Sequence, residues 1–199
     1  MTSTANRLPR FLMPNVITAV RIAVSLVVFA AIQWKYYLVA LVLFVFAAGT
    51  DWIDGFLARK YGLVTKLGRV LDPLADKLVI CGTFIYLSSI PESQILAWMS
   101  VVVVVRELAV TVVRSFLEEH GKDFSASMPG KIKMALQCAA AIGSLWLLHV
   151  NRTASASDEL RTVVTWLAWA AVAATVYSGI VYIRPASTLL AQIQSDRPA

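Results

Sequence analysis

Charged residues are scarce in this chain of 199 residues. Asp, Glu, Lys and Arg together make up 15% of the sequence, whereas 58% of it is hydrophobic. A soluble domain carries about 25% charged residues. The chain therefore lacks the polar side chains that a water-exposed surface requires, and we expect a protein that is largely embedded in lipid.

Residues that bind soft metals are also few, with two cysteines and two histidines. Cys81 and Cys138 fall in apolar stretches without CxxC spacing, which is typical of small buried side chains. The net charge is +6, but no basic stretch is long enough to form a nucleic-acid groove. We therefore expect no nucleic-acid partner, and the positive charge suits an anionic membrane leaflet or an anionic substrate.

Six apolar stretches have about the 20 residues that a helix needs to cross a bilayer. They cover about residues 14–34, 36–57, 71–90, 95–117, 132–150 and 160–183. The sequence thus predicts an all-α, polytopic membrane protein with six transmembrane helices. We expect a single domain over residues 1–199, with a short cytoplasmic N-terminal segment of about residues 1–13.

Lys and Arg are distributed unequally between the two sides of this topology. They gather in the two tails and in the loops near 58–70 and 114–133, while the other side has Lys35, Arg152 and Arg161. Because basic loops stay in the cytoplasm, both termini and the 58–70 loop are predicted to be cytoplasmic.

Two further features can be placed on these helices. Arg21 lies inside the first apolar stretch and is expected to face the interior of the bundle. The aromatic residues Trp34, Tyr36 and Tyr37 are expected to form an interface belt at the outer side.

The segment TDWIDGFLARKYGLVTKLGRVLDPLADK, residues 50–77, places four aspartates at helix ends. Asp51 and Asp54 are three residues apart, and Asp72 and Asp76 are four apart, so each pair shares one helix face. The basic, glycine-containing stretch between the pairs is typical of a turn. All four carboxylates can then converge on one point.

Carboxylates that converge in a membrane require positive charge beside them, because a single aspartate at a helix centre costs about 2.5–3.5 kcal/mol on insertion scales. Hard divalent cations such as Mg²⁺, Mn²⁺ or Ca²⁺ bind oxygen ligands and would supply it. Two such ions about 3.5–4 Å apart would form a clamp suited to displacement at phosphorus. Beside them, Gly55 leaves room for a ligand, and Arg59 is placed to contact a phosphate.

The same segment resembles the signature of the CDP-alcohol phosphotransferases, D-x-x-D-G-x-x-A-R, eight residues, then G-x-x-x-D-x-x-x-D. Every fixed position matches: Asp51, Asp54, Gly55, Ala58, Arg59, Gly68, Asp72 and Asp76. The resemblance implies the six-helix fold of that family and a membrane enzyme that is usually a homodimer. Such an enzyme uses two divalent ions, Mg²⁺ or Mn²⁺, to displace CMP from a CDP-linked lipid by an alcohol. It would sit in the inner (cytoplasmic) membrane as a multi-pass protein with its site at the cytoplasmic side.

The resemblance also implies roles for individual residues. Asp51, Asp54 and Asp72 would be metal ligands, and Asp76 would complete the metal site and act as the base. The cytidine diphosphate would be held by Thr50, Gly55, Ala58, Arg59 and Gly68.

Two further stretches resemble family members whose acceptor is glycerol 3-phosphate: MPNVITAVRI, residues 13–22, and VRELAVTVVRSFLEEHGKDFSASMPGKIKMALQ, residues 105–137. The implied reaction joins CDP-diacylglycerol and sn-glycerol 3-phosphate and releases CMP. One position departs, since Met134 stands where the family usually has Thr. The expected ligands of the acceptor phosphate are Arg106, Arg114, Lys131 and Lys133. Two alternatives stay open: Arg106 could instead pair with Glu107, and Lys131 and Lys133 could simply be basic residues of a cytoplasmic loop.

Three alternatives are compatible with parts of the sequence. A family member could use another acceptor, such as inositol phosphate, serine or phosphatidylglycerol, because the aspartate motif identifies only the CDP moiety. A divalent-cation transporter could line its path with aspartates, but transporters bind ions near the bilayer midplane. A catalytically inactive scaffold would not need the complete set of aspartates.

Overall fold

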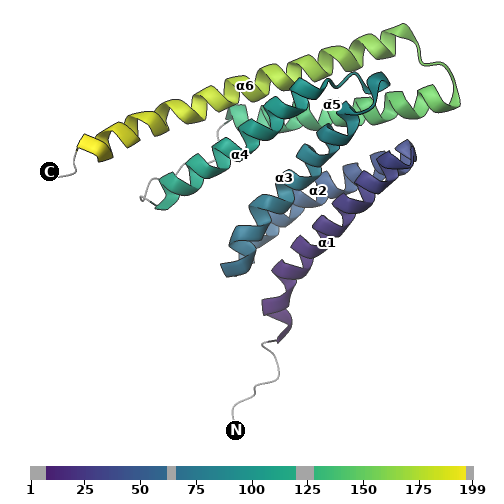
Figure 1. Cartoon of the computed structure of the whole chain (residues 1–199). Helices are drawn as coiled ribbons and strands as arrows, with labels where there is room; N and C mark the ends of the chain where they lie inside the picture. The colour runs from purple at the N-terminus through teal and green to yellow at the C-terminus, as the bar shows by residue number, and fades with distance from the viewer. Residues whose placement is uncertain (1–7, 62–65, 120–127, 196–199) are drawn as a thin grey trace.

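The computed structural model shows a bundle of α-helices (Figure 1) and describes residues 8–61, 66–119 and 128–195. Side chains are described within residues 19–49, 77–115 and 128–183. In chain order the elements are α1 (Leu8–Gln33), α2 (Tyr37–Tyr61), α3 (Lys66–Ser88), a 3-10 turn η1 (Pro91–Ser93), α4 (Ala97–Glu119), α5 (Met128–Thr153) and α6 (Asp158–Ser195). No strand occurs within these three ranges, so the all-α prediction is confirmed there.

Each predicted apolar stretch coincides with one helix, but the helices run beyond the stretches at several ends. Helix α1 begins at Leu8, within the predicted N-terminal segment, and α6 continues to Ser195. Within the part of the chain whose side chains are described, two segments are long and apolar enough to cross a membrane, Met128–Thr153 and Asp158–Ile183. Shorter apolar helical segments are Ala19–Gln33, Tyr37–Gly49 and Lys77–Ser88.

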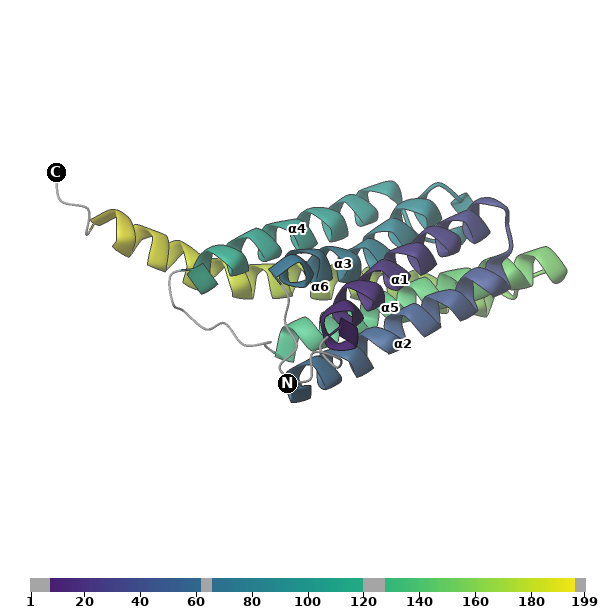
Figure 2. The same cartoon turned by 90° about the horizontal axis from the view of Figure 1, so that it is seen from below.

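The helices form two arms that meet at one end of the molecule. Helix α1 packs against α2 and α3, while α6 packs against α4 and α5. Helix α5 also contacts α2, and α3 contacts α4, so the two arms share one core. Figures 1 and 2 show that the arms diverge towards the end where α2 finishes and α3 begins.

The outer surface is strongly apolar. Helix α4 exposes a stripe at spacings of four, three and four residues, formed by Val101, Val105, Leu108 and Val112. Each of these side chains is more than half exposed. Such a surface is typical of helices that face lipid rather than water.

The turn between α1 and α2 is tied to α5. Lys35 adopts a left-handed backbone with φ of 63°, and the Tyr36 amide donates to the Ala31 carbonyl at 2.8 Å, which closes the C-terminus of α1. The guanidinium of Arg152 in α5 donates to the Lys35 carbonyl. This end of the bundle is therefore fixed by backbone and side-chain hydrogen bonds together.

The predictions for Arg21 and for the aromatic residues near the α1–α2 turn have different outcomes. Arg21 is 8% exposed, so its predicted place in the bundle interior is confirmed. Trp34 and Tyr36 are exposed, as an interface belt requires. The prediction for Tyr37 was wrong, because its ring packs into the hydrophobic core as the first residue of α2.

Close packing of α1 on α3 depends on Gly82. A Cβ atom at this position would lie 2.1 Å from Cζ of Phe29, whose ring stacks on Tyr86 at a centroid distance of 5.2 Å. The Phe29 ring could move aside only by giving up that stacking and its place in the core. The missing side chain therefore allows the two helices to approach each other.

We predict that Gly82→Ala lowers the stability of the bundle by about 1–3 kcal/mol, because the added methyl overpacks this contact. The matched control is Gly49→Ala, since no atom lies within 4 Å of a Cβ built at Gly49. Thermal unfolding of the detergent-solubilised protein measures both variants. An equal midpoint for Gly82→Ala and the wild type would contradict the packing argument.

Candidate active site

The four aspartates occupy matching positions on two consecutive helices. Asp51 lies ten residues before the end of α2, and Asp76 lies ten residues after the start of α3, so each is about 15 Å from its helix end. Asp54 and Asp72 lie about 10 Å from the same ends. An antiparallel pair of helices joined by residues 62–65 would therefore carry the carboxylates at two shared levels.

The side chains of residues 50–76 lie outside those that the structure describes. The expected metal ligands, the base and the residues expected to hold cytidine diphosphate all fall in this range, so those roles stay predictions: Thr50, Asp51, Asp54, Gly55, Ala58, Arg59, Gly68, Asp72 and Asp76. Among the described side chains, no three of His, Cys, Asp and Glu come together as metal ligands. The aspartate set itself, four carboxylates without a softer ligand, suits hard divalent cations.

A buried polar cluster joins α4, α5 and α6. Its members are Arg106, Glu107, Lys133, Gln137, Thr175 and Ser178. Three side chains approach Oε1 of Glu107: the ammonium of Lys133, Nη1 of Arg106 at 3.3 Å and Nε2 of Gln137 at 3.5 Å. Glu107 and Lys133 are 6% and 5% exposed, so this pair is shielded from solvent.

Arg106 is held from a second direction by α6. Its Nη2 atom donates to Oγ of Ser178 at 2.7 Å, and its guanidinium carbon lies 5.7 Å from the centroid of the Tyr182 ring. A Cβ atom at Gly179 would lie 3.3 Å from Cγ of Arg106, so the arginine lies close along the α6 backbone. The expected alternative that Arg106 pairs with Glu107 is confirmed.

Two polar atoms of the cluster are buried without a hydrogen-bond partner: Oε1 of Gln137 and Nε of Arg106. The orientation of the Gln137 amide follows from its neighbours. Its nitrogen faces the Glu107 carboxylate, which only accepts, and the Thr175 hydroxyl, which already donates to the Ala171 carbonyl. The described residues thus leave one acceptor and one donor of the cluster unpaired in its interior.

The cluster lies beside α3, near the residues that follow Asp76 in the chain. Lys77, which follows Asp76 in the chain, and Cys81, one turn further on, both lie within electrostatic range of Lys133. Lys77 is also partly buried, as is Cys81. Positive side chains of the cluster thus neighbour the helix that carries two of the four aspartates.

The structure separates the four cations that were expected to bind the acceptor phosphate. Arg106 and Lys133 share the Glu107 carboxylate, whereas Arg114 and Lys131 are exposed. Lys131 and Lys133 are two residues apart, so they point about 200° apart around α5. Only one of the two can face the bundle interior.

The cluster as a unit was not predicted from the sequence. Gln137 lies one turn after Lys133 on the same face of α5, and this i, i+4 spacing was the available signal. Thr175 and Ser178 lie within an apolar run of α6 with a spacing of three residues. This spacing was a weaker signal.

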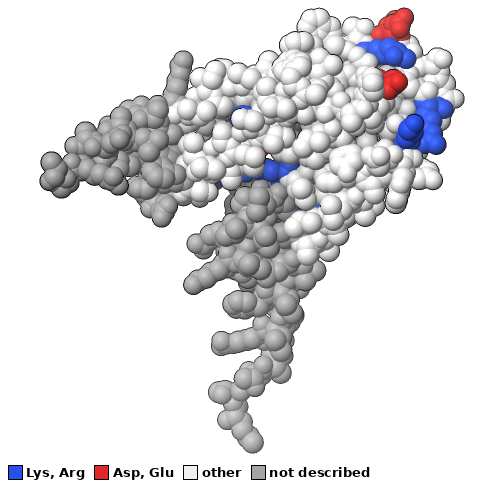
Figure 3. Space-filling view, in the orientation of Figure 1, with Lys and Arg blue, Asp and Glu red and all other residues white. Residues whose placement is uncertain are grey.

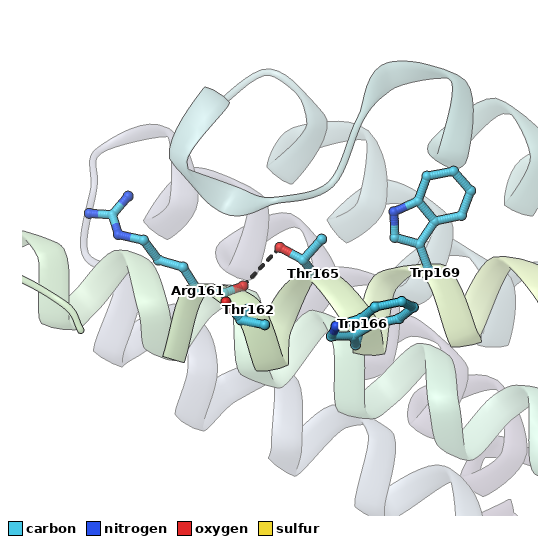
Figure 4. Close-up of a pocket in the computed structure, with 5 residues that line it drawn as sticks. All are labelled: Arg161, Thr162, Thr165, Trp166 and Trp169. Atoms are coloured by element: carbon cyan, nitrogen blue, oxygen red, sulfur yellow. Dashed lines mark hydrogen bonds between the residues drawn. The ribbon is translucent and has the colours of Figure 1, made fainter. Parts of the chain in front are cut away.

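A pocket of about 420 Å³ occurs at the opposite end of the bundle (Figure 4). Arg161, Thr162, Thr165, Trp166 and Trp169 line it, all on the first turns of α6. It carries one cation and two tryptophans and no carboxylate. Because α2 ends and α3 begins at the other end, this pocket is remote from the aspartates and resembles part of an aromatic belt.

Charged side chains are distributed unevenly over the described surface in Figure 3. In Figure 3, acidic and basic atoms gather at the end that holds the α1–α2 and α5–α6 turns. Further Lys and Arg atoms appear near the middle of the view. Most of the remaining described surface in this view is uncharged.

Comparison with known proteins gives consistent results over most of the chain. A family model described as CDP-alcohol phosphatidyltransferase matches residues 11–177. A protein of Bacillus subtilis (strain 168) is 37% identical over 187 residues, which cover 86% of this chain and 93% of that protein. A protein of Pectobacterium atrosepticum is 33% identical over 143 residues, which cover 69% of this chain and 78% of that protein. Both relatives are named CDP-diacylglycerol–glycerol-3-phosphate 3-phosphatidyltransferase.

Proposed function

This chain belongs to the CDP-alcohol phosphatidyltransferase family, and we propose that it transfers a phosphatidyl group from CDP-diacylglycerol to sn-glycerol 3-phosphate. The products are phosphatidylglycerophosphate and CMP, so the enzyme acts in phospholipid biosynthesis. The observation that carries this function is the likeness to relatives of that name, which extends over 93% and 78% of their lengths. The signature from Asp51 to Asp76 is complete in this chain, which supports an active enzyme rather than an inactive scaffold.

The experiment that tests the function is a panel of acceptors offered to the purified protein with CDP-diacylglycerol. We expect CMP release with glycerol 3-phosphate and little above background with inositol phosphate, serine or phosphatidylglycerol. Preferential use of one of those acceptors would keep the family assignment and replace the acceptor. Metal flux into liposomes without nucleotide would instead favour a transporter.

The aspartates would hold the divalent ions, Mg²⁺ or Mn²⁺. Asp51, Asp54 and Asp72 are assigned as ligands, and Asp76 as a ligand that also faces the acceptor. When bound, the ions neutralise charge on the diphosphate and on the departing CMP. Four carboxylates on two helix faces supply the hard oxygen donors that such ions prefer.

The remaining residues of the signature are assigned to the nucleotide. Arg59 would contact a phosphate with its guanidinium. Thr50, Gly55, Ala58 and Gly68 are small or polar and would let the cytidine diphosphate approach the helix backbone closely.

Asp76 is assigned as the general base. The acceptor hydroxyl oxygen forms a bond to the phosphatidyl phosphorus, the bond from that phosphorus to the CMP oxygen breaks, and the hydroxyl proton passes to the Asp76 carboxylate. An alcohol is a weak nucleophile, so a carboxylate that takes its proton accelerates the attack.

The acceptor phosphate would bind at the buried polar cluster. Among the described side chains of the cluster, Arg106 and Lys133 bring two positive charges against the one negative charge of Glu107, which leaves one surplus positive charge for an anion. Arg114 and Lys131 are exposed at the ends of the same helices, where they are assigned to attract the phosphate before it reaches the cluster.

The protein is a membrane protein, and we assign all six helices as spans of the inner (cytoplasmic) membrane. The site then opens at the cytoplasmic side, where Lys and Arg are concentrated in the chain.

A cysteine placed at 60–66 should be labelled from the cytoplasmic side and one placed at 153–157 from outside. The protein is also assigned as a homodimer. Cross-linking in the membrane tests the dimer.

A further inference from the structure

Glu107 lies at the centre of the buried polar cluster and connects α4 to α5. Its carboxylate accepts from the ammonium of Lys133 and from Nη1 of Arg106 at 3.3 Å. The side chains of all three residues are at most 10% exposed. Among the side chains that the structure describes, Glu107 is therefore the negative charge that these two buried cations share.

The two cations differ in how strongly they depend on Glu107. Arg106 is also held by Ser178, by the face of Tyr182 and by the close approach of α6 at Gly179. For Lys133, the hydrogen-bond partner that the structure describes is Glu107. A lysine ammonium is a point charge on a flexible four-carbon stem, so its position follows the carboxylate that binds it.

Glu107 is in turn restrained by Gln137. The Gln137 amide nitrogen reaches Oε1 of Glu107 at 3.5 Å and Oγ1 of Thr175 at 2.9 Å. Gln137 and Thr175 are both fully buried. The carboxylate is thus connected to α6 as well as to α5, which limits its movement.

We propose that Glu107 is a positioning residue, which holds the ammonium of Lys133 beside Arg106 where the two meet the phosphate of the acceptor. The inference rests on the proposed function, since it acts on a phosphate-bearing acceptor. Without the carboxylate, two like charges in a low-dielectric interior would repel each other and separate. With it, the pair stays together and keeps one surplus positive charge for the phosphate.

The first test is Glu107→Gln, with KM measured separately for glycerol 3-phosphate and for CDP-diacylglycerol. We expect KM for glycerol 3-phosphate to rise about 10- to 100-fold, the usual effect of losing a charged hydrogen-bond partner. KM for CDP-diacylglycerol should stay within about twofold. The matched control is Glu159→Gln, the same change at an exposed position near the start of α6, which should alter neither constant.

The second test remains informative even if Glu107→Gln fails to fold. Lys133→Met and the double variant Glu107→Gln/Lys133→Met both avoid leaving Lys133 as an unpaired buried cation. If Glu107 acts through Lys133, the double variant should have the KM for glycerol 3-phosphate of Lys133→Met, within about twofold. A KM for glycerol 3-phosphate in the double variant well above that of Lys133→Met would overturn the proposal.

These outcomes separate the inference from the function on which it rests. If the wild type releases no CMP with glycerol 3-phosphate, the proposed function fails first. If the wild type is active and Glu107→Gln leaves both KM values unchanged, or raises both equally, the positioning role is wrong and the function stands.

Discussion

Chelation of divalent metal ions by EDTA should abolish CMP release, and Mg²⁺ or Mn²⁺ should restore it. The expected loss is at least about 10³-fold, because metal ions contribute several kcal/mol to displacement at phosphorus. Asp51→Asn should reproduce the loss, since an amide keeps the shape of the carboxylate and removes its charge. CMP release measured against metal concentration should show a higher metal requirement for this variant.

The control for Asp51→Asn is Asp158→Asn, the same change at an exposed position where α6 begins, at the other end of the bundle. It should retain the activity and the metal requirement of the wild type. Full activity of the wild type in metal-free buffer would show that the aspartates do not serve as metal ligands.

Asp76→Asn should lower kcat by about 10²–10⁴-fold, the usual contribution of a general base. An amide cannot take the proton of the acceptor hydroxyl, but the other three carboxylates remain to hold metal. The variant should therefore still bind CDP-diacylglycerol when metal is present. Single-turnover rate and binding of a CDP-lipid, measured on one preparation, test the two parts together.

Comparison of Asp76→Asn with Asp51→Asn shows whether Asp76 acts as the general base or mainly as a metal ligand. If Asp76→Asn turns over normally, the assignment of the base is wrong. If it loses nucleotide binding as completely as Asp51→Asn does, Asp76 serves mainly as a ligand, and another group takes the proton.

The helices could be predicted from the sequence because their apolar runs are long, but their ends could not. The run in α6 stops at Arg184, whereas the helix continues to Ser195. Hydropathy indicates where hydrocarbon contact ends, and a helix can extend beyond it as an interfacial segment. The burial of Tyr37 could not be predicted either, because an aromatic side chain at a span end suits both an interface and a core.

The buried polar cluster could be anticipated only in part. The adjacency of Arg106 and Glu107 was visible, and so was the group of basic residues near Lys131 and Lys133. Helical periodicity places Lys131 and Lys133 on opposite faces but does not say which face points inward, since that depends on how α5 packs on α4 and α6. Contacts with Ser178 span more than 70 positions in the chain, and no local pattern encodes them.

The polar pair near the middle of α4 has a consequence for biogenesis. In the proposed topology, α4 enters the bilayer carrying Arg106 and Glu107 near its centre, and a charged residue there costs about 2.5–3.5 kcal/mol on insertion. Lys133, Gln137 and Ser178, which offset this cost, belong to helices that the ribosome makes later. Stable insertion of α4 should therefore require the presence of α5 and α6. A nascent chain that is halted before α6 should leave α4 accessible to membrane quality-control proteases.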